Sequence, residues 1–315
     1  MVKARELHPI QLDSDLSLEN WAERFVSQAH LESAEKLDKA IRLIHRLERE
    51  DEAATDWKGP DAYQFGLEMA DILSMMPIDE DALVAALLYR SVRIERLHLR
   101  DVRHQFGKTV ARMIEGVQQM AIISQAHQDT PTQFLGAAEN QTDAVRRMLV
   151  AVIDDVRVAL IKLAERTAAI RAVKSASDER RLKVAREVSD VYAPLAHRLG
   201  VGHLKWELED LSFRYLDENG YKQIAKELAE RREDRERYIE ELVDSIQQTL
   251  ASQKVHADLT WRAKHIFSIW RKMQRKQVDF SQIYDVRAVR ILVDSIRDCY
   301  AALGLVHGAY KKYSI

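Results

Sequence analysis

The strongest constraint on the fold of this chain is a helical repeat of apolar residues that runs through residues 18–250. Within Glu35–Arg49, for example, the apolar side chains recur three or four residues apart, which places them on one face of a helix. Further along the chain, Val255–Trp261 and Val286–Val293 alternate or are rich in β-branched residues, a pattern typical of strands. We therefore predict a mainly α protein, in which an all-helical domain precedes the start of an α/β domain.

The length of the chain predicts two domains. At roughly 150 residues per domain, 315 residues are enough for two proper cores. We expect a first domain over residues 1–200, and a second over residues 201–315 that contains connecting helices and the first part of the α/β domain. Residues 221–252 are predicted to form a single helix, and residues 124–142, which are rich in Gln, Thr and Asn, are predicted to form a long loop.

The charge balance and the single cysteine exclude several classes of protein. The formal net charge is −2, so any site for a polyanion must be local, because the chain as a whole does not attract nucleic acid or an anionic membrane. One cysteine, Cys299, excludes a disulfide framework and fits a reducing compartment; we expect it to be a small core residue. No apolar run is long enough to cross a membrane, so we expect a cytoplasmic protein without a membrane partner.

A basic segment over residues 260–278 is the feature that most directly suggests a ligand, because it contains no acidic residue. At about 100° per residue, a helix would gather one hydroxyl and four cations on one face: Lys264, Ser268, Arg271, Lys272 and Arg275. Asp285 follows at the head of a predicted strand. Cations, a hydroxyl and a carboxylate are the groups that a nucleoside triphosphate and its Mg²⁺ require. Two alternatives stay open: an ordinary solvated face with Asp285 as a turn residue, and RNA binding through interleaved aromatic residues.

Long blocks of the sequence resemble the RelA/SpoT family. They are WRAKHIFSIWRKMQRK, IYDVRAVRILV, DDVRVALIKLAER, EGVQQM and VYAPLAHRLGVGHLKWELEDLSFRYL. Enzymes of this family make the stringent-response alarmone (p)ppGpp by a Mg²⁺-dependent transfer of pyrophosphate from ATP to the 3′-hydroxyl of GTP or GDP. The resemblance therefore implies a (p)ppGpp synthetase, or GTP pyrophosphokinase, with an HD-type hydrolase-like domain before an α/β synthetase domain.

The resemblance assigns the ATP-binding residues of the synthetase domain. It implies that Arg262 stacks on the adenine and that Lys264, Ser268 and Lys272 hold the ATP phosphates. Asp285 would be the Mg²⁺ ligand. The chain departs from the family at residues 261 and 263, where Trp and Ala replace Gly and Pro. These two changes affect how the backbone leads into the ATP-binding helix.

The hydrolase-like domain resembles the family but lacks its metal-binding residues. The expected histidines, carboxylates and asparagine are replaced, in chain order, by Phe65, Tyr89, Arg90, Arg93, Ile94, Glu165 and Ala169. A single glutamate cannot hold a metal ion, and two nearby arginines would repel one. We therefore expect no Mn²⁺ in this domain and no ppGpp hydrolase activity.

Other parts of the family are expected beyond Ile315. They are the guanine-nucleotide segment, the catalytic glutamate, and C-terminal domains that bind the ribosome and uncharged tRNA. We therefore expect no catalytic residue of the synthetase within these 315 residues, and we expect that this polypeptide alone is inactive although its longer parent is a synthetase. The alternative is a regulatory or interaction module, in which the hydrolase-like domain controls the synthetase half.

Overall fold

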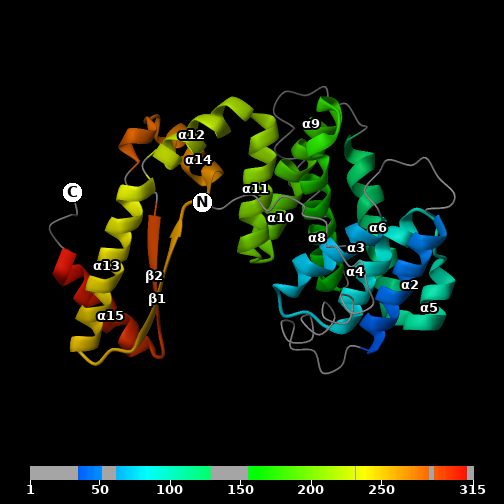
Figure 1. Ribbon diagram of the computed structural model, residues 1–315, viewed down its shortest axis with the longest axis horizontal. Coiled ribbons are helices and arrows are strands. Elements are labelled where there is room, and N and C mark those ends of the chain that lie inside the picture. The colour runs from blue at the N-terminus through cyan, green and yellow to red at the C-terminus, as the bar shows by residue number, and fades with distance from the viewer. Residues whose placement is uncertain (1–34, 52–61, 129–154, 231, 284–286, 311–315) are drawn as a thin grey trace. The chain divides into compact units, whose positions relative to one another are not determined.

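The structure is a computed structural model that describes residues 35–51, 62–128, 155–230, 232–283 and 287–310 (Figure 1). The chain divides into two compact units, one that ends at Leu216 and one that begins at Asp217. Each unit has its own hydrophobic core. The sequence predicts a functional boundary at residue 200, and this boundary stays a prediction. The helix α11 (Gly202–Leu216), which follows residue 200, packs in the core of the first unit.

The first unit is helical throughout its described residues. Its elements are α2 (Glu35–Asp51), α3 (Ala62–Ser74), α4 (Glu80–Arg93), α5 (Leu99–Phe106), α6 (Lys108–Gln128), α8 (Val156–Ala172), a 3₁₀ turn (Val173–Ser175), α9 (Asp178–Glu187), a π-helical turn (Val188–Tyr192), α10 (Ala193–Arg198) and α11. The helix α6 includes residues 124–128, which were predicted to be the start of a loop; the rest of that predicted loop lies outside the described residues.

The helix α4 forms the centre of the first unit, and packs against α2, α3, α6 and α8. Asp79 caps its N-terminus by accepting a hydrogen bond from the backbone N–H of Ala82 at 3.0 Å. The helix α3 approaches α4 closely because Gly66 has no side chain: a Cβ there would lie 2.6 Å from the carbonyl oxygen of Leu87. This close approach brings Phe65 of α3 near the last turns of α4.

The π-helical turn places an aromatic ring beside α8. Residues 188–192 adopt this wider turn just before Pro194, whose ring cannot occupy the interior of a regular α-helix. Tyr192, at the end of the turn, is fully buried and lies against α8.

The second unit contains four helices, two strands and a 3₁₀ turn among its described residues. They are α12 (Glu218–Glu230), α13 (Arg232–Ser252), β1 (Ala257–Ala263), α14 (Ile266–Lys276), the 3₁₀ turn (Phe280–Gln282), β2 (Arg287–Val293) and α15 (Ile296–Tyr310). The strands pair antiparallel, with Ala257 opposite Val293 and Ala263 opposite Arg287. The helix α13 packs on β1, and α15 packs on β2.

The predicted fold class is confirmed: a mainly helical chain ends in a small sheet that begins the α/β part. Two further details differ from the prediction. Residues 262 and 263 of the basic segment form the end of strand β1 and are not helical, since they pair with β2. Cys299 is an exposed residue of α15 instead of a core residue. Within the described part of the chain, none of the helices has the length and apolar character needed to cross a membrane.

Candidate functional site

The buried carboxylate of Glu165 is the centre of a cluster of ion pairs in the first unit. Its side chain is only 1% exposed. Its Oε2 atom accepts hydrogen bonds from Nζ of Lys162 at 2.8 Å and from Nε of Arg166 at 2.6 Å. Its Oε1 atom accepts a second hydrogen bond from Arg166 and lies 3.3 Å from Nη1 of Arg93. Three cations therefore surround one carboxylate.

The surrounding cations keep this carboxylate ionised. Burial alone would raise the pKa of Glu165, but Arg166 and Lys162 reverse this effect and hold the pKa well below its ordinary value. Burial lowers the pKa of Lys162 to about 8, against the opposing attraction of Glu165. Arg166 also donates a hydrogen bond to Glu187 at 3.0 Å, so a second carboxylate partly balances the cluster.

Aromatic rings lie around the cluster of ion pairs at Glu165. The guanidinium carbon of Arg90 lies 5.4 Å from the centroid of the Phe65 ring, within the range of a cation–π contact. Tyr89 is fully buried, and burial raises its pKa to about 12. The ring of Tyr192 lies 5.7 Å from Nζ of Lys162. The site is thus lined by cations and aromatic rings from α3, α4, α8 and the π-helical turn.

The second candidate site is the basic helix α14. His265 is its N-cap residue, and Ile269 is the buried anchor of its apolar face. Ser268 and Lys272 lie one turn apart, and both are half-buried. The ring of Phe267 stacks on Trp270 with centroids 5.5 Å apart, so these aromatic side chains contact each other.

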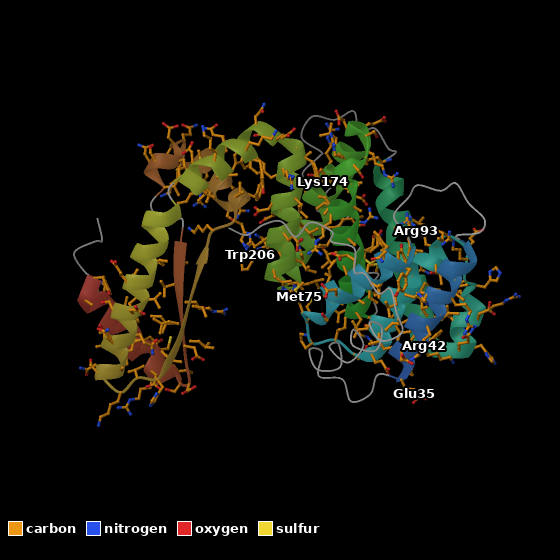
Figure 2. All side chains as sticks on the ribbon, viewed as in Figure 1. Glu35, Arg42, Met75, Arg93, Lys174 and Trp206 are labelled. Carbon is orange, nitrogen blue, oxygen red and sulfur yellow. The ribbon has the colours of Figure 1, made fainter. Side chains whose placement is uncertain are left out.

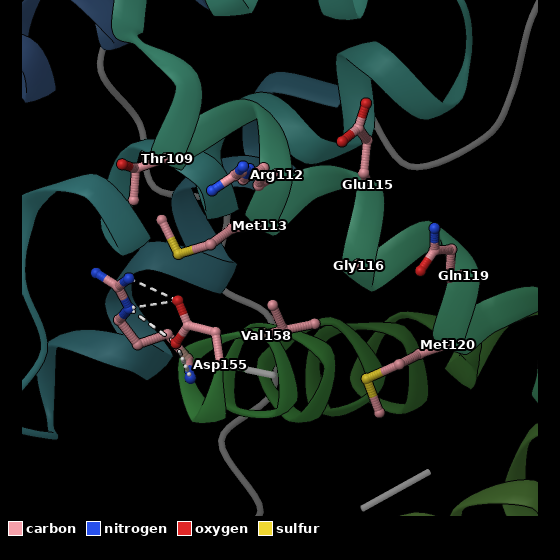
Figure 3. Close-up of a pocket in the computed structure, with 10 residues that line it drawn as sticks. Thr109, Arg112, Met113, Glu115, Gly116, Gln119, Met120, Asp155 and Val158 are labelled. Atoms are coloured by element: carbon pink, nitrogen blue, oxygen red, sulfur yellow. Dashed lines mark hydrogen bonds and ion pairs between the residues drawn. The ribbon is translucent and has the colours of Figure 1, made fainter. Parts of the chain in front are cut away.

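The first unit also contains a cavity of about 680 Å³ between α6 and the first turn of α8 (Figure 3). At the edge of the cavity, Nε of Arg157 donates a hydrogen bond to Oδ1 of Asp155 at 2.9 Å. The same guanidinium also donates a hydrogen bond to Asp79. These pairs join the N-terminal ends of α4 and α8, because Asp79 and Asp155 are the N-cap residues of those helices. The charges at this edge therefore pair with one another.

Comparison with known proteins identifies the family. Residues 40–202 match the HD domain family, and residues 261–314 match the region found in RelA / SpoT proteins. The chain belongs to the RelA/SpoT family. Similar proteins include the GTP pyrophosphokinase of Photobacterium angustum, which is 41% identical over 311 residues, or 99% of this chain and 40% of that protein. The GTP pyrophosphokinase of Escherichia coli K12 is 48% identical over 246 residues, or 78% of this chain and 33% of that protein.

A more distant relative is the GTP pyrophosphokinase of Streptomyces coelicolor, 38% identical over 274 residues, or 85% of this chain and 31% of that protein. The chain thus spans about a third to two-fifths of the length of the relatives that it matches. The HD match ends at residue 202, and the RelA/SpoT match begins at residue 261, on strand β1. The two matches therefore fall in the two compact units.

Within this RelA/SpoT-family chain, the structure brings most of the substituted hydrolase positions together. Arg90 stacks on Phe65, and Arg93 faces both Tyr89 and Glu165. Arg93, labelled in Figure 2, ends helix α4. Two other positions do not join the cluster of ion pairs. Ile94 is the C-cap residue of α4 with 37% exposure, and Ala169 packs against the hydrophobic core.

Sequence reasoning missed the residues that neutralise Glu165. Lys162 and Arg166 belong to the quoted block DDVRVALIKLAER, three residues before Glu165 and one after it. Cations so close to a glutamate in a helix could have predicted that the carboxylate of Glu165 is paired with them. Among the described residues there is no group of three or more His, Cys, Asp or Glu side chains that could hold a metal ion.

The predicted ATP-binding residues lie on three different parts of the second unit. Arg262 is a residue of strand β1 opposite Ala288, Lys264 lies in the connection after that strand, and Ser268 and Lys272 lie on α14. Lys264 is therefore outside the helix, contrary to the expected single helical face. Asp285 lies outside the described residues.

Proposed function

We propose that this chain carries the ATP-and-magnesium half of a pyrophosphate-transfer site in its second unit. The observation that supports the proposal most strongly is the match of residues 261–314 to the RelA / SpoT region, which includes the end of β1 and all of α14. The relatives are named GTP pyrophosphokinases, and we propose ATP as the donor and GTP or GDP as the acceptor, as the family resemblance implies. The half-buried cations beside Ser268 are the chemistry that a triphosphate requires.

In this proposal each residue has one role. Arg262 stacks on adenine, while Lys264, Ser268 and Lys272 bind phosphate oxygens. Asp285 binds Mg²⁺, which would neutralise charge on the phosphates when it is bound. In the transfer, the 3′-oxygen of the acceptor forms a bond to the β-phosphorus of ATP, the bond from that phosphorus to the α-phosphate oxygen breaks, and AMP leaves. The residues of this chain act by holding and orienting the donor nucleotide.

A polypeptide of these 315 residues is proposed to bind ATP without completing the transfer. In this proposal the guanine-nucleotide segment lies outside these residues, as does the catalytic glutamate, which would accept the proton of the 3′-hydroxyl. The ribosome and uncharged-tRNA contacts are proposed to lie outside them as well. The direct test is incubation of this polypeptide with ATP, GTP and Mg²⁺; formation of (p)ppGpp would contradict this part of the proposal.

ATP titration tests the half-site itself. We expect Mg²⁺-dependent ATP binding that weakens by about tenfold in Lys272→Ala, because each charge-assisted hydrogen bond contributes roughly 1.5–3 kcal/mol. Lys254→Ala is a matched control, since Lys254 is an exposed lysine of the same unit near the end of α13. Equal affinity in the two variants would contradict the assignment of Lys272.

We also propose that the first unit has no ppGpp hydrolase activity. The supporting observation is that the carboxylate of Glu165 is already surrounded by Lys162, Arg166 and Arg93, so its negative charge is not available for a metal ion. The test is hydrolysis of ppGpp in the presence of Mn²⁺. Turnover that depends on Mn²⁺ and is lost in Glu165→Gln would contradict this proposal.

A regulatory module is the second candidate function, because the first unit keeps a well-packed hydrophobic core although the positions that bind a metal ion in the family are replaced. Arg171 of α8 forms an ion pair with Glu68 of α3. Its Nε atom also lies 2.6 Å from Oε1 of Glu207 on α11. This buried bridge joins the helical core to the last helix of the first unit. A module of this kind predicts that changes in the first unit alter the synthetase activity of the longer protein, whereas ATP affinity in the 315-residue polypeptide stays the same.

A further inference from the structure

Three guanidinium groups act on the region at the C-terminal end of α4, and few carboxylates among the described residues balance them. Arg90 and Arg93 lie one turn apart on α4, and Arg180 of α9 adds a third positive charge that acts on Arg90. We call these three residues the arginine cluster. Glu165 is the carboxylate that acts on Arg90, and it already pairs with two other cations on its own helix. The arginine cluster therefore carries an excess of positive charge.

Arg90 is held in place by an aromatic ring, but among the described residues its guanidinium forms no ion pair. Its guanidinium lies over Phe65 at 5.4 Å, and its Nε atom is buried without a hydrogen-bond acceptor among the described residues. Burial lowers the pKa of Arg90, and repulsion from Arg93 lowers it further. Buried polar atoms in folded proteins are almost always hydrogen-bonded, so this N–H group is a donor whose acceptor a ligand could supply.

Arg93 gives the cluster access to solvent. Its side chain is 32% exposed. Its Nη1 atom lies 3.3 Å from Oε1 of Glu165, longer than the roughly 2.7–2.9 Å of a strong charge-assisted hydrogen bond. Arg93 can therefore turn donors toward an incoming anion without breaking a short ion pair. Glu165 stays neutralised by Lys162 and Arg166 in either case.

We propose that the arginine cluster binds a phosphate-type oxyanion, either pyrophosphate or the diphosphate group of a nucleotide, without a metal ion. Planar guanidinium groups donate pairs of parallel hydrogen bonds that match phosphate oxygens. The contact with Phe65 restrains the guanidinium of Arg90 before the ligand arrives, which reduces the entropy lost on binding. The anion supplies the negative charge that the site lacks. This site is separate from the ATP half-site, which lies in the second unit.

The experiment is a calorimetric titration of the 315-residue polypeptide with sodium pyrophosphate in EDTA, which removes metal-bridged binding. We expect saturable binding, weakened by about tenfold or more in Arg90→Gln and in Arg93→Gln, since each removes a charge-assisted contact. Arg100→Gln is the matched control: its side chain is 82% exposed and its guanidinium lies 3.6 Å from Asp101, on the neighbouring helix α5. This variant should bind pyrophosphate as the unmodified chain does.

Other outcomes overturn the proposal. It fails if the unmodified chain shows no saturable binding, or if Arg90→Gln and Arg93→Gln bind as tightly as Arg100→Gln. It also fails if Lys272→Ala abolishes the binding, because the anion would then occupy the second unit. If Arg90→Gln does not fold, Arg93→Gln decides, because its partly exposed side chain is not needed for the core.

Parallel titrations with ADP and GDP identify the source of the anion. Tighter binding of ADP or GDP than of pyrophosphate indicates a nucleotide, and equal affinity indicates that the diphosphate group suffices.

Discussion

Lys162 and Glu165 form an ion pair of 2.8 Å in which both side chains are only 1% exposed. Lys162 lies three residues before Glu165 on α8, so the two side chains share a helix face. Taking two charges out of water is costly, and the pair is tolerated because Arg166 adds further hydrogen bonds to the same carboxylate. The ammonium group of Lys162 therefore occupies space beside Glu165 that a metal ion bound to this carboxylate would need.

Glu165→Gln should destabilise the first unit by about 3–5 kcal/mol, because it leaves the buried Lys162 without its opposite charge. Urea unfolding followed by circular dichroism measures the change. Glu115→Gln is the control, since Glu115 is 38% exposed and lies 3.4 Å from Arg103; its loss should cost less than about 1 kcal/mol. Equal effects of the two variants would show that the buried cluster does not stabilise the fold.

The stability that Glu165 contributes should disappear in acid. Its pKa in the folded chain is held below the ordinary value of 4.5. As the pH falls below that value, the unfolded chain binds a proton at this residue and the folded chain does not, so unfolding becomes more favourable. The difference in unfolding free energy between the unmodified chain and Glu165→Gln should therefore shrink from pH 7 to pH 3.5. A constant difference over this range would contradict the assignment.

Gly66→Ala should destabilise the first unit by roughly 1–3 kcal/mol, because the added Cβ would lie 2.6 Å from the backbone oxygen of Leu87. Backbone cannot move aside as a flexible side chain can, so α3 and α4 must separate. Gly304→Ala on α15 is a matched control, since a Cβ there meets no atom within 4 Å. Alanine at residue 304 should be neutral or slightly stabilising in thermal unfolding.

Arg171→Gln should cost about 3 kcal/mol or more, because Glu68 is buried and would lose its charged partner. Hydrogen exchange should show increased opening of α11, which Arg171 joins to α8 through Glu207. As a control, Arg181→Gln removes an exposed contact to Asp178 and should change stability by less than about 1 kcal/mol. If α11 exchanged at the same rate in both variants, Arg171 would not be the link between these helices.

Much of the fold could be predicted because its signals are local. Helical spacing of apolar residues predicted α2, and the change in pattern near residue 255 predicted the first strand. Tyr221–Ser252 was predicted as one helix, but the structure has α12 and α13 there. Helical spacing gives no information about a break between two consecutive helices when the charged residues continue through it.

The sequence by itself determined the mainly helical class and the small sheet near residue 290, because composition and spacing express these directly. The replacement of the family's metal-binding residues followed only from the resemblance to the RelA/SpoT family. Only the tertiary structure decided that Arg93, 72 residues before Glu165, faces the same carboxylate, and that Arg90 stacks on Phe65. Only pairing with β2 decided that Arg262 lies on a strand. Such contacts depend on helix packing and on backbone hydrogen bonds between distant segments, which no local pattern specifies.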